Sequence, residues 1–218
     1  MKLSLVLLAL LTCSAAVGQK KKMERPYAGY YPKTTEDIGR MYESLRFYEV
    51  KEADKVASVG AANGHGEVTV AAYVKNVDWT IQDIDTIALH DLSKVKAWYE
   101  KLLGEPITGS FVTIAGEEKK TNLPRHYFDK IILANVYHEL TDRTSIMKDI
   151  YGALNDTGVV LILEPMAVKP GDLHGGCKHP KLWAPDFLAE MKSFGFEMTD
   201  KKFTDSHEFV SLYTFVRR

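Results

Sequence analysis

Residues 55–85 read KVASVGAANGHGEVTVAAYVKNVDWTIQDID, and this stretch decides the fold. It begins with an apolar, β-branched run and continues through a glycine-containing turn, a helical pattern and a second apolar run that ends in acidic residues. A glycine turn at a helix N-terminus lets the backbone approach a nucleotide-like ligand, and an acidic residue about 20 positions further on can hold a ribose. The stretch therefore predicts a β-α-β unit with a ligand-binding turn.

The rest of the chain continues this alternation. Short apolar runs predict five strands, at residues 55–59, 78–82, 110–114, 130–134 and 159–163. Helical spacing predicts helices at residues 35–49, 66–75, 85–104, 143–154 and 185–194. Two last runs, 197–203 and 209–216, are joined by a polar turn and predict an antiparallel hairpin. Because the central runs are apolar on both faces, we expect an α/β fold of three layers, with a mostly parallel seven-stranded sheet.

Length, composition and net charge limit the classes of protein to which the chain can belong. The chain has 218 residues, of which 45% are hydrophobic and 26% charged, and its net charge is −1. These values are typical of one globular α/β domain with a full core. A nucleic-acid-binding domain normally carries a basic excess, so no nucleic-acid partner is expected.

The N-terminus has the pattern of a secretory signal peptide over residues 1–18. Lys2 precedes the apolar run Leu3–Leu11, which is too short to span a bilayer, and Ala16-Val17-Gly18 offers a small-residue cleavage site. We therefore expect an exported protein, periplasmic or secreted, with no transmembrane span in its mature chain. An uncleaved anchor and a lipoprotein modified at Cys13 are the alternatives.

Removal of residues 1–18 would leave Cys177 as the only cysteine, so no intramolecular disulfide is expected. Residues 19–35 are polar and proline-containing, and we interpret them as a lead-in segment. Residues 36–218 then form the single folded domain, since neither a repeat nor a second domain is evident.

From Tyr42 to the C-terminus the chain resembles the class I S-adenosylmethionine-dependent methyltransferases, which have a Rossmann-like fold. Four local features carry the resemblance: the glycine turn at residues 59–64, Asp83 at the end of the second strand, Gly116-Glu117-Glu118 with the downstream Leu123-Pro124 and Phe128-Asp129, and residues 135–140 after the fourth predicted strand. The resemblance implies methyl transfer from S-adenosylmethionine to a small-molecule nucleophile.

The resemblance also implies roles for individual residues. Gly60, Ala61 and Gly64 would form the loop under the methionine part of the cofactor. Asp83 would accept hydrogen bonds from the ribose hydroxyls, Glu117 would lie by the adenine amino group, and Asn135 would lie beside the sulfonium.

Two positions of the glycine turn depart from the family pattern. Ser58 stands where members usually have an acidic residue, and Ala62 stands where they usually have glycine. A methyl group at position 62 narrows the loop and disfavours a positive φ. These departures leave open a second interpretation, in which the domain is non-catalytic and binds another ligand or partner.

Two residues near the ends of the fourth and fifth predicted strands are candidates for chemistry on the substrate. His138 is a possible general base, because its ordinary pKa lies near neutrality. Glu164 could contact the substrate or pair with a nearby base.

The loop at residues 165–182 is interpreted as a substrate lid, with His174 as a substrate contact. His174, Cys177 and His179 are also potential metal ligands, but their spacing does not match a common zinc pattern, so no metal site is predicted. His138 or Glu164 could complete such a site only through tertiary folding. A metal-dependent hydrolase is thus the weaker alternative function.

Overall fold

The structure is a computed structural model that describes residues 31–203 and 210–218. The chain divides into two units, residues 1–31 and Pro32–Arg218, and the second holds every element described below. The predicted signal peptide, most of the lead-in segment and the turn between the last two strands lie outside the described residues. In the described parts of the chain, no helix combines the length and the apolar character that a membrane crossing requires.

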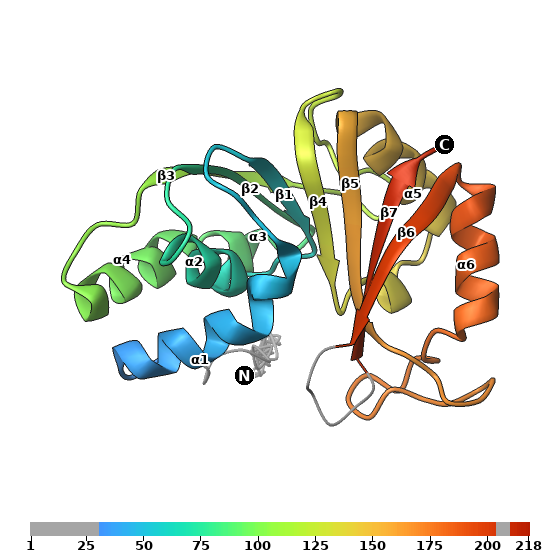
Figure 1. Ribbon diagram of the computed structural model, residues 1–218, viewed down its shortest axis with the longest axis horizontal. Coiled ribbons are helices and arrows are strands. Elements are labelled where there is room, and N and C mark those ends of the chain that lie inside the picture. Colours follow the sequence, from blue (N-terminus) through green and yellow to red (C-terminus); the bar gives the residue numbers. More distant parts are fainter. Residues whose placement is uncertain (1–30, 204–209) are drawn as a thin grey trace, which may run out of the picture. The chain divides into compact units, whose positions relative to one another are not determined.

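The core of the domain is a seven-stranded sheet with the order β3-β2-β1-β4-β5-β7-β6 (Figure 1). The strands are β1 (Lys55–Val59), β2 (Val77–Asp83), β3 (Gly109–Ala115), β4 (Phe128–Ala134), β5 (Leu154–Pro165), β6 (Phe196–Phe203) and β7 (Val210–Arg217). Strands β1 to β5 run parallel to one another, and β7 runs antiparallel to both β5 and β6. This arrangement confirms the predicted mostly parallel sheet with a C-terminal antiparallel hairpin.

Helices lie between most of the successive strands (Figure 1). They are α1 (Thr35–Leu45), α2 (His65–Ala71), α3 (Thr86–Leu89), α4 (Leu92–Leu103), α5 (Arg143–Ala153) and α6 (Ala184–Ser193), with short 3-10 turns η1 (Arg46–Tyr48) and η2 (Tyr137–Glu139). Helices α5 and α6 contribute to one hydrophobic cluster with β1, β4, β5 and β7. Helix α2 contacts both α1 and α4.

Alternation along the strands explains the three layers. Ala57 and Val59 of β1 belong to the cluster with α5 and α6. Their neighbour Val56 is equally buried, and successive side chains of a strand point to opposite faces of the sheet. The sheet is therefore covered on both sides, as the apolar runs predicted.

The helix predicted over residues 85–104 is wrong as a single element, because it divides into α3 and α4. Asp85 does cap α3, since its carboxylate accepts hydrogen bonds from the backbone amides of Ile87 and Ala88 at 2.9 and 3.1 Å. The chain then turns at residues 90–91 before α4 begins at Leu92. Propensity alone gave no signal for this break.

Two other boundaries also differ from the predictions. The turn expected before the fifth strand lies inside β5, because Leu154 pairs with Phe128 while Val159 pairs with Lys130, so the residues between them bulge out of the ladder. Helix α2 ends at Ala71, earlier than predicted.

Candidate functional site

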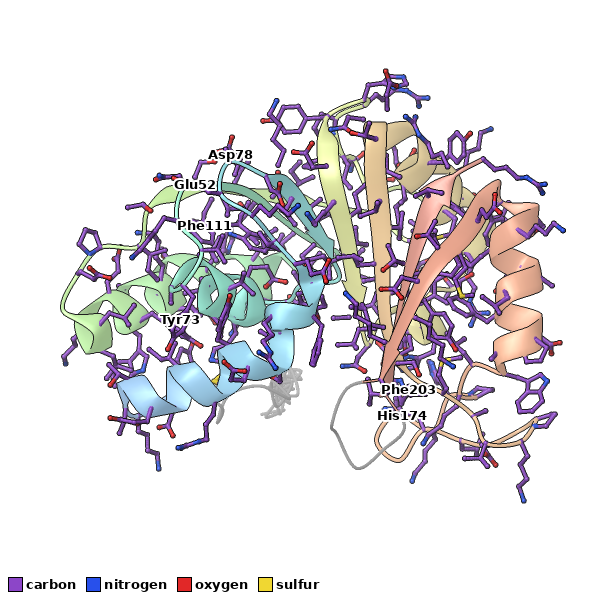
Figure 2. The ribbon with its side chains drawn as sticks, in the orientation of Figure 1. Glu52, Tyr73, Asp78, Phe111, His174 and Phe203 are labelled. Atoms are coloured by element: carbon purple, nitrogen blue, oxygen red, sulfur yellow. The ribbon has the colours of Figure 1, made fainter. Side chains whose placement is uncertain are left out.

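Four of the predicted site residues lie at or just beyond the carboxyl ends of parallel strands. Gly60 follows β1, Asp83 ends β2, Asn135 follows β4 and Glu164 is near the end of β5. Figure 2 labels Asp78 at the amino end of β2 and His174 at the opposite edge of the sheet. In open parallel sheets, ligands bind outside the carboxyl ends of the strands. We call this side of the sheet the carboxyl edge.

The glycine turn has the left-handed geometry that the resemblance implies. Gly60, Ala62 and Gly64 have φ angles of 70°, 50° and 72°. Ala62 therefore adopts the conformation that glycine usually supplies, at a cost of about 1–2 kcal/mol for a residue with a Cβ atom. The backbone amide of Ala61 donates to the carbonyl of Gln82 at 3.1 Å, which joins the turn to β2.

Asp83 closes the glycine turn onto β2. Its Oδ2 accepts a hydrogen bond from the backbone amide of Ala62 at 2.7 Å, and its Oδ1 accepts one from the amide of Asp85 at 2.8 Å. An ionised carboxylate has about four acceptor positions, so each oxygen keeps one further position. The contact between Asp83 and a ribose stays a prediction.

Two side chains that the sequence interpretation missed shape this turn. A Cβ atom on Gly60 would lie 2.5 Å from Cγ2 of Val136, so the glycine permits Val136 to pack on the turn. Gln82 is buried, its Oε1 lies 3.4 Å from the amide of Gly60, and a Cβ atom on Gly116 would lie 1.7 Å from its Nε2. A polar residue inside an apolar strand was the available signal for Gln82.

Glu117 and Asn135 are both exposed at the carboxyl edge. Glu117 forms a tight backbone pairing with Lys120, with N···O distances of 2.7 and 3.2 Å. Asn135 has a φ of 56° and donates its amide to the carbonyl of Leu163 at 2.8 Å, which fixes the turn after β4. Their roles toward a cofactor stay predictions.

A buried carboxylate lies next to Ser58, the position where the family usually has an acid. Glu67 of α2 is buried, and the side chain of Ser58 hydrogen-bonds to it. Burial raises the pKa of Glu67, and the hydrogen bond from Ser58 opposes that shift. The charged residue within the otherwise buried run of α2 was the signal for this pair, which the sequence interpretation missed.

His138 and Glu164 form a buried pair. Nδ1 of His138 lies 2.7 Å from Oε2 of Glu164, and the His138 amide donates to Oε1 at 3.3 Å. The Glu164 side chain is 1% exposed, so it is placed to hold His138, one of its two predicted roles. The hydrogen bond with Glu164 is the main cause that raises the pKa of His138 to about 9. Because a charged ring donates protons, the role of His138 as a general base stays a prediction.

The loop after β5 folds back on itself and brings His174 to His138. Leu173 pairs with Pro180 in an antiparallel bridge, and the amide of His174 donates to the carbonyl of His179 at 2.8 Å. The rings of His138 and His174 stack with centroids 5.0 Å apart. His174 therefore lies at the carboxyl edge, as the lid interpretation requires.

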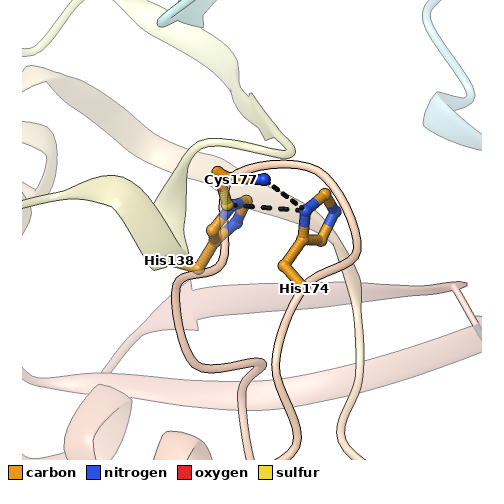
Figure 3. Close-up of side chains that lie close together, drawn as sticks. All are labelled: His138, His174 and Cys177. Carbon is orange, nitrogen blue, oxygen red and sulfur yellow. Dashed lines mark hydrogen bonds between the residues drawn. The ribbon is translucent and has the colours of Figure 1, made fainter.

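Cys177 lies between these two histidines (Figure 3). Its sulfur is 3.4 Å from Nε2 of His138 and 3.4 Å from Nδ1 of His174. His179 lies at the side, with its ring centroid 6.3 Å from that of His138. Tertiary folding thus brings His138 close to His174 and Cys177. Their spacing in the sequence did not reveal this grouping.

Comparison with known proteins finds similarity in structure alone. No protein-family description matches the chain, and no curated protein matches it in sequence. The domain is similar to a SAM-dependent methyltransferase from Aquifex aeolicus, with a TM-score of 0.62, 14% identity, and coverage of 80% of this chain and 87% of that one. It is also similar to the mitomycin 7-O-methyltransferase MmcR, with a TM-score of 0.64, 11% identity, and coverage of 83% and 54%.

A third similar structure is the [4+2]-cyclase SpnF, with a TM-score of 0.63, 11% identity, and coverage of 83% of this chain and 81% of that one. The chain therefore has the Rossmann-like fold of SAM-dependent methyltransferases. Because a cyclase has the same fold, the activity has to be argued from the site.

Proposed function

We propose that this domain binds S-adenosylmethionine at the β1–β2 half of the carboxyl edge and transfers its methyl group to a small-molecule nucleophile. The observation that carries the proposal is the left-handed glycine turn, which Asp83 ties to the end of β2. Structural similarity to SAM-dependent methyltransferases supports the same function.

The residues present fit this cofactor. Ala62 keeps the left-handed backbone despite its methyl group, so the turn retains the shape that glycine would give. Backbone groups of Gly60, Ala61 and Gly64 would receive the methionine part, and Asp83 would receive the ribose. When bound, S-adenosylmethionine supplies an electrophilic methyl group.

Glu117 and Asn135 complete the proposed cofactor contacts. Glu117 lies beyond β3, next to the strand that carries Asp83, and would contact the adenine. Asn135 follows β4 and would lie nearer the sulfonium. The hydrogen bond from its backbone amide to the carbonyl of Leu163 fixes its position.

The methyl acceptor would bind at the β4–β5 half of the carboxyl edge. Methyl transfer mainly requires that the nucleophile is positioned, with removal of its proton where needed. Glu164 orients His138, and His174 lies over the same edge on the loop after β5. These residues are proposed to face the acceptor, whose chemical identity is open.

A thermal-shift titration with S-adenosylhomocysteine tests the cofactor proposal. Binding to the native state raises the stability by RT ln(1 + [ligand]/Kd), so a clear rise in Tm is expected. Asp83→Ala should abolish the rise. Asp78→Ala is the matched control, because Asp78 lies on the same strand at its amino end and bonds Ser110 at 2.7 Å.

Absence of any rise at millimolar ligand, with correctly folded protein, would contradict the proposal. Equal loss in Asp78→Ala and Asp83→Ala would also contradict it.

The second candidate is a non-catalytic domain that uses the same edge to bind another ligand. The observation that favours it is the strained Ala62 at the centre of the turn. A panel of hydroxyl, amine and thiol acceptors, incubated with radiolabelled S-adenosylmethionine, separates the two candidates. Absence of both S-adenosylmethionine binding and methyl transfer, with correctly folded protein, supports the non-catalytic domain that binds another ligand.

We also propose that residues 1–18 direct export. The support is the sequence pattern of Lys2, the apolar run and the small residues before Gln19. Intact-mass measurement of the protein from an exporting host should give a chain that begins at Gln19. A full-length chain retained in the cytoplasm would contradict export.

A further inference from the structure

We propose that His138, His174 and Cys177 bind a divalent transition-metal ion of the zinc class. Each residue offers one ligand atom, and the three atoms lie within 4.8 Å of one another. His138 comes from η2 after β4, whereas His174 and Cys177 come from the loop after β5. The site is thus assembled by the fold, and it requires neither a cofactor nor methyl transfer.

The distances fit tetrahedral coordination. The sulfur of Cys177 lies 3.4 Å from each of the two histidine nitrogens. With Zn–S of about 2.3 Å and Zn–N of about 2.0 Å, tetrahedral angles separate sulfur and nitrogen by about 3.5 Å. The two sulfur–nitrogen separations are therefore those of a zinc site, and the two histidine nitrogens lie within 4.8 Å of each other.

The hydrogen bonds fix the tautomer of both rings in the form that metal binding needs. Nδ1 of His138 can donate its hydrogen to Glu164, which leaves the lone pair on Nε2, the atom that faces Cys177. Nδ1 of His174 accepts from the amides of Gly176 and Cys177 at 3.3 and 3.4 Å, so this nitrogen carries the lone pair of the neutral ring, and a bound metal ion would replace these two long hydrogen bonds.

Glu164 supplies the outer contact that metal-binding histidines usually have. A histidine ligand almost always donates its second ring nitrogen to a carboxylate, a carbonyl or water, which orients the ring and raises its basicity. Glu164 is fully buried and contacts both the ring and the amide of His138. A buried carboxylate needs hydrogen-bond partners of this kind. The proposed metal site explains why the carboxylate of Glu164 is buried at this position.

The donor set selects the class of metal. One thiolate and two imidazoles suit zinc and its neighbours in the first transition series, whereas Mg²⁺ and Ca²⁺ prefer oxygen ligands. On binding, the S–H bond of Cys177 breaks and a sulfur–metal bond forms, and where the His138 ring is charged its Nε2–H bond breaks as well, so that these protons pass to solvent. Both histidines bind through neutral rings.

Three protein ligands leave a fourth position for water or for a heteroatom of a bound ligand. Oε1 of Glu139 lies 3.7 Å from Nε2 of His138, and the Glu139 side chain is 52% exposed, so this acidic group faces the solvent side of the site. An open fourth position is typical of catalytic zinc sites, while structural sites have four protein ligands.

The same residues also form a Cys177–His138–Glu164 arrangement, the order of a nucleophile, a base and an orienting acid. A nucleophilic cysteine needs one histidine. The second nitrogen at 3.4 Å, from His174, has no part in that chemistry and favours the metal site.

Isothermal titration of metal-free, reduced protein with Zn²⁺, without any methyl donor, tests the proposal. One ion per chain is expected, with no heat from Mg²⁺ beyond dilution. Cys177→Ser and His174→Gln each remove a ligand atom, so each should weaken binding by more than the roughly 10–100-fold that is typical for loss of an outer contact. The matched control is His179→Gln, a histidine of the same loop outside the cluster, and it should bind as the wild type does.

Circular dichroism of each metal-free variant establishes that it is folded. Absence of stoichiometric Zn²⁺ binding to folded wild type would overturn the proposal. Rapid alkylation of Cys177 by iodoacetamide at slightly acidic pH, unaffected by Zn²⁺, would also overturn it and support the nucleophile. Equal loss of affinity in His179→Gln would overturn the ligand assignment. None of these results depends on the proposed methyl transfer.

Discussion

The two halves of the carboxyl edge are built in different ways. In the β1–β2 half, the polar side chain of Asp83 is bonded to backbone amides of the turn itself. In the β4–β5 half, the potential ligand atoms of His138, His174 and Cys177 lie within 4.8 Å of one another. The first half consists of a backbone turn held by hydrogen bonds, and the second half consists of side chains with potential metal-ligand atoms. The proposed cofactor binding and the proposed metal binding should therefore respond to different substitutions.

Among the substitutions that leave the three metal ligands in place, Glu164→Gln should have the largest effect on the β4–β5 half. The amide keeps the size of the side chain but orients His138 less well, and loss of such an outer contact typically weakens metal binding by about 10–100-fold. Zinc titration measures the change. The rise in Tm with S-adenosylhomocysteine should persist, and its loss would show that the two halves are not separable.

Asp83→Ala should have the next largest effect, and it acts on the β1–β2 half. The amides of Ala62 and Asp85 lose a charged acceptor, which should lower the free energy of unfolding by about 2 kcal/mol. Urea denaturation measures the loss. Zinc stoichiometry should stay at one ion per chain, and a metal site disrupted by this substitution would contradict the separation.

Ala62→Gly should stabilise the protein by up to about 1 kcal/mol. The left-handed backbone at position 62 is strained for alanine, and glycine relieves that strain while losing some chain entropy on folding. Chemical denaturation provides the measurement. A destabilised variant would show that the methyl group of Ala62 makes contacts worth more than the strain.

Glu67→Gln should have the smallest effect, and the effect should depend on pH. Because the folded-state pKa of Glu67 is raised, its contribution to stability is fully present below the unfolded-state pKa of about 4.3 and is lost as pH rises through the folded-state value. The glutamine variant has no ionisable group at position 67, so it does not lose this stability as the pH rises. Its Tm should equal that of the wild type near about pH 4 and exceed it near about pH 8. A difference that does not change with pH would contradict the raised pKa.

The fold and the placement of Gly60 and Asp83 at the carboxyl edge were predictable because their signals are local. Apolar runs and helical spacing predicted the sheet. The spacing between Gly60 and Asp83 in the sequence predicted that both residues lie in the β1–β2 half of the carboxyl edge. The break between α3 and α4 was missed because the apolar residues on both sides of residues 90–91 were assigned to one helix.

The β4–β5 half could be predicted only in part. His138, Glu164 and His174 were candidates for contact with the substrate, and Cys177 was named as a potential metal ligand. No metal site was predicted, because Cys177 lies 39 residues from His138 in the chain and meets it only after the loop folds back. Spacing rules for metal sites apply to ligands on one local segment, and they do not detect a site that joins a strand end to a distant loop. Glu67 was missed for a similar reason, since its partner Ser58 lies on a different element.

The central claim is that the carboxyl edge carries a metal site separate from its cofactor turn. The most direct test is the absorption spectrum of the protein with Co²⁺ in place of zinc, compared with that of Cys177→Ser. We expect intense visible bands of tetrahedral cobalt and a near-ultraviolet thiolate-to-cobalt band in the wild type, with the thiolate band lost in the variant. A wild-type spectrum identical to that of free Co²⁺ would contradict the account.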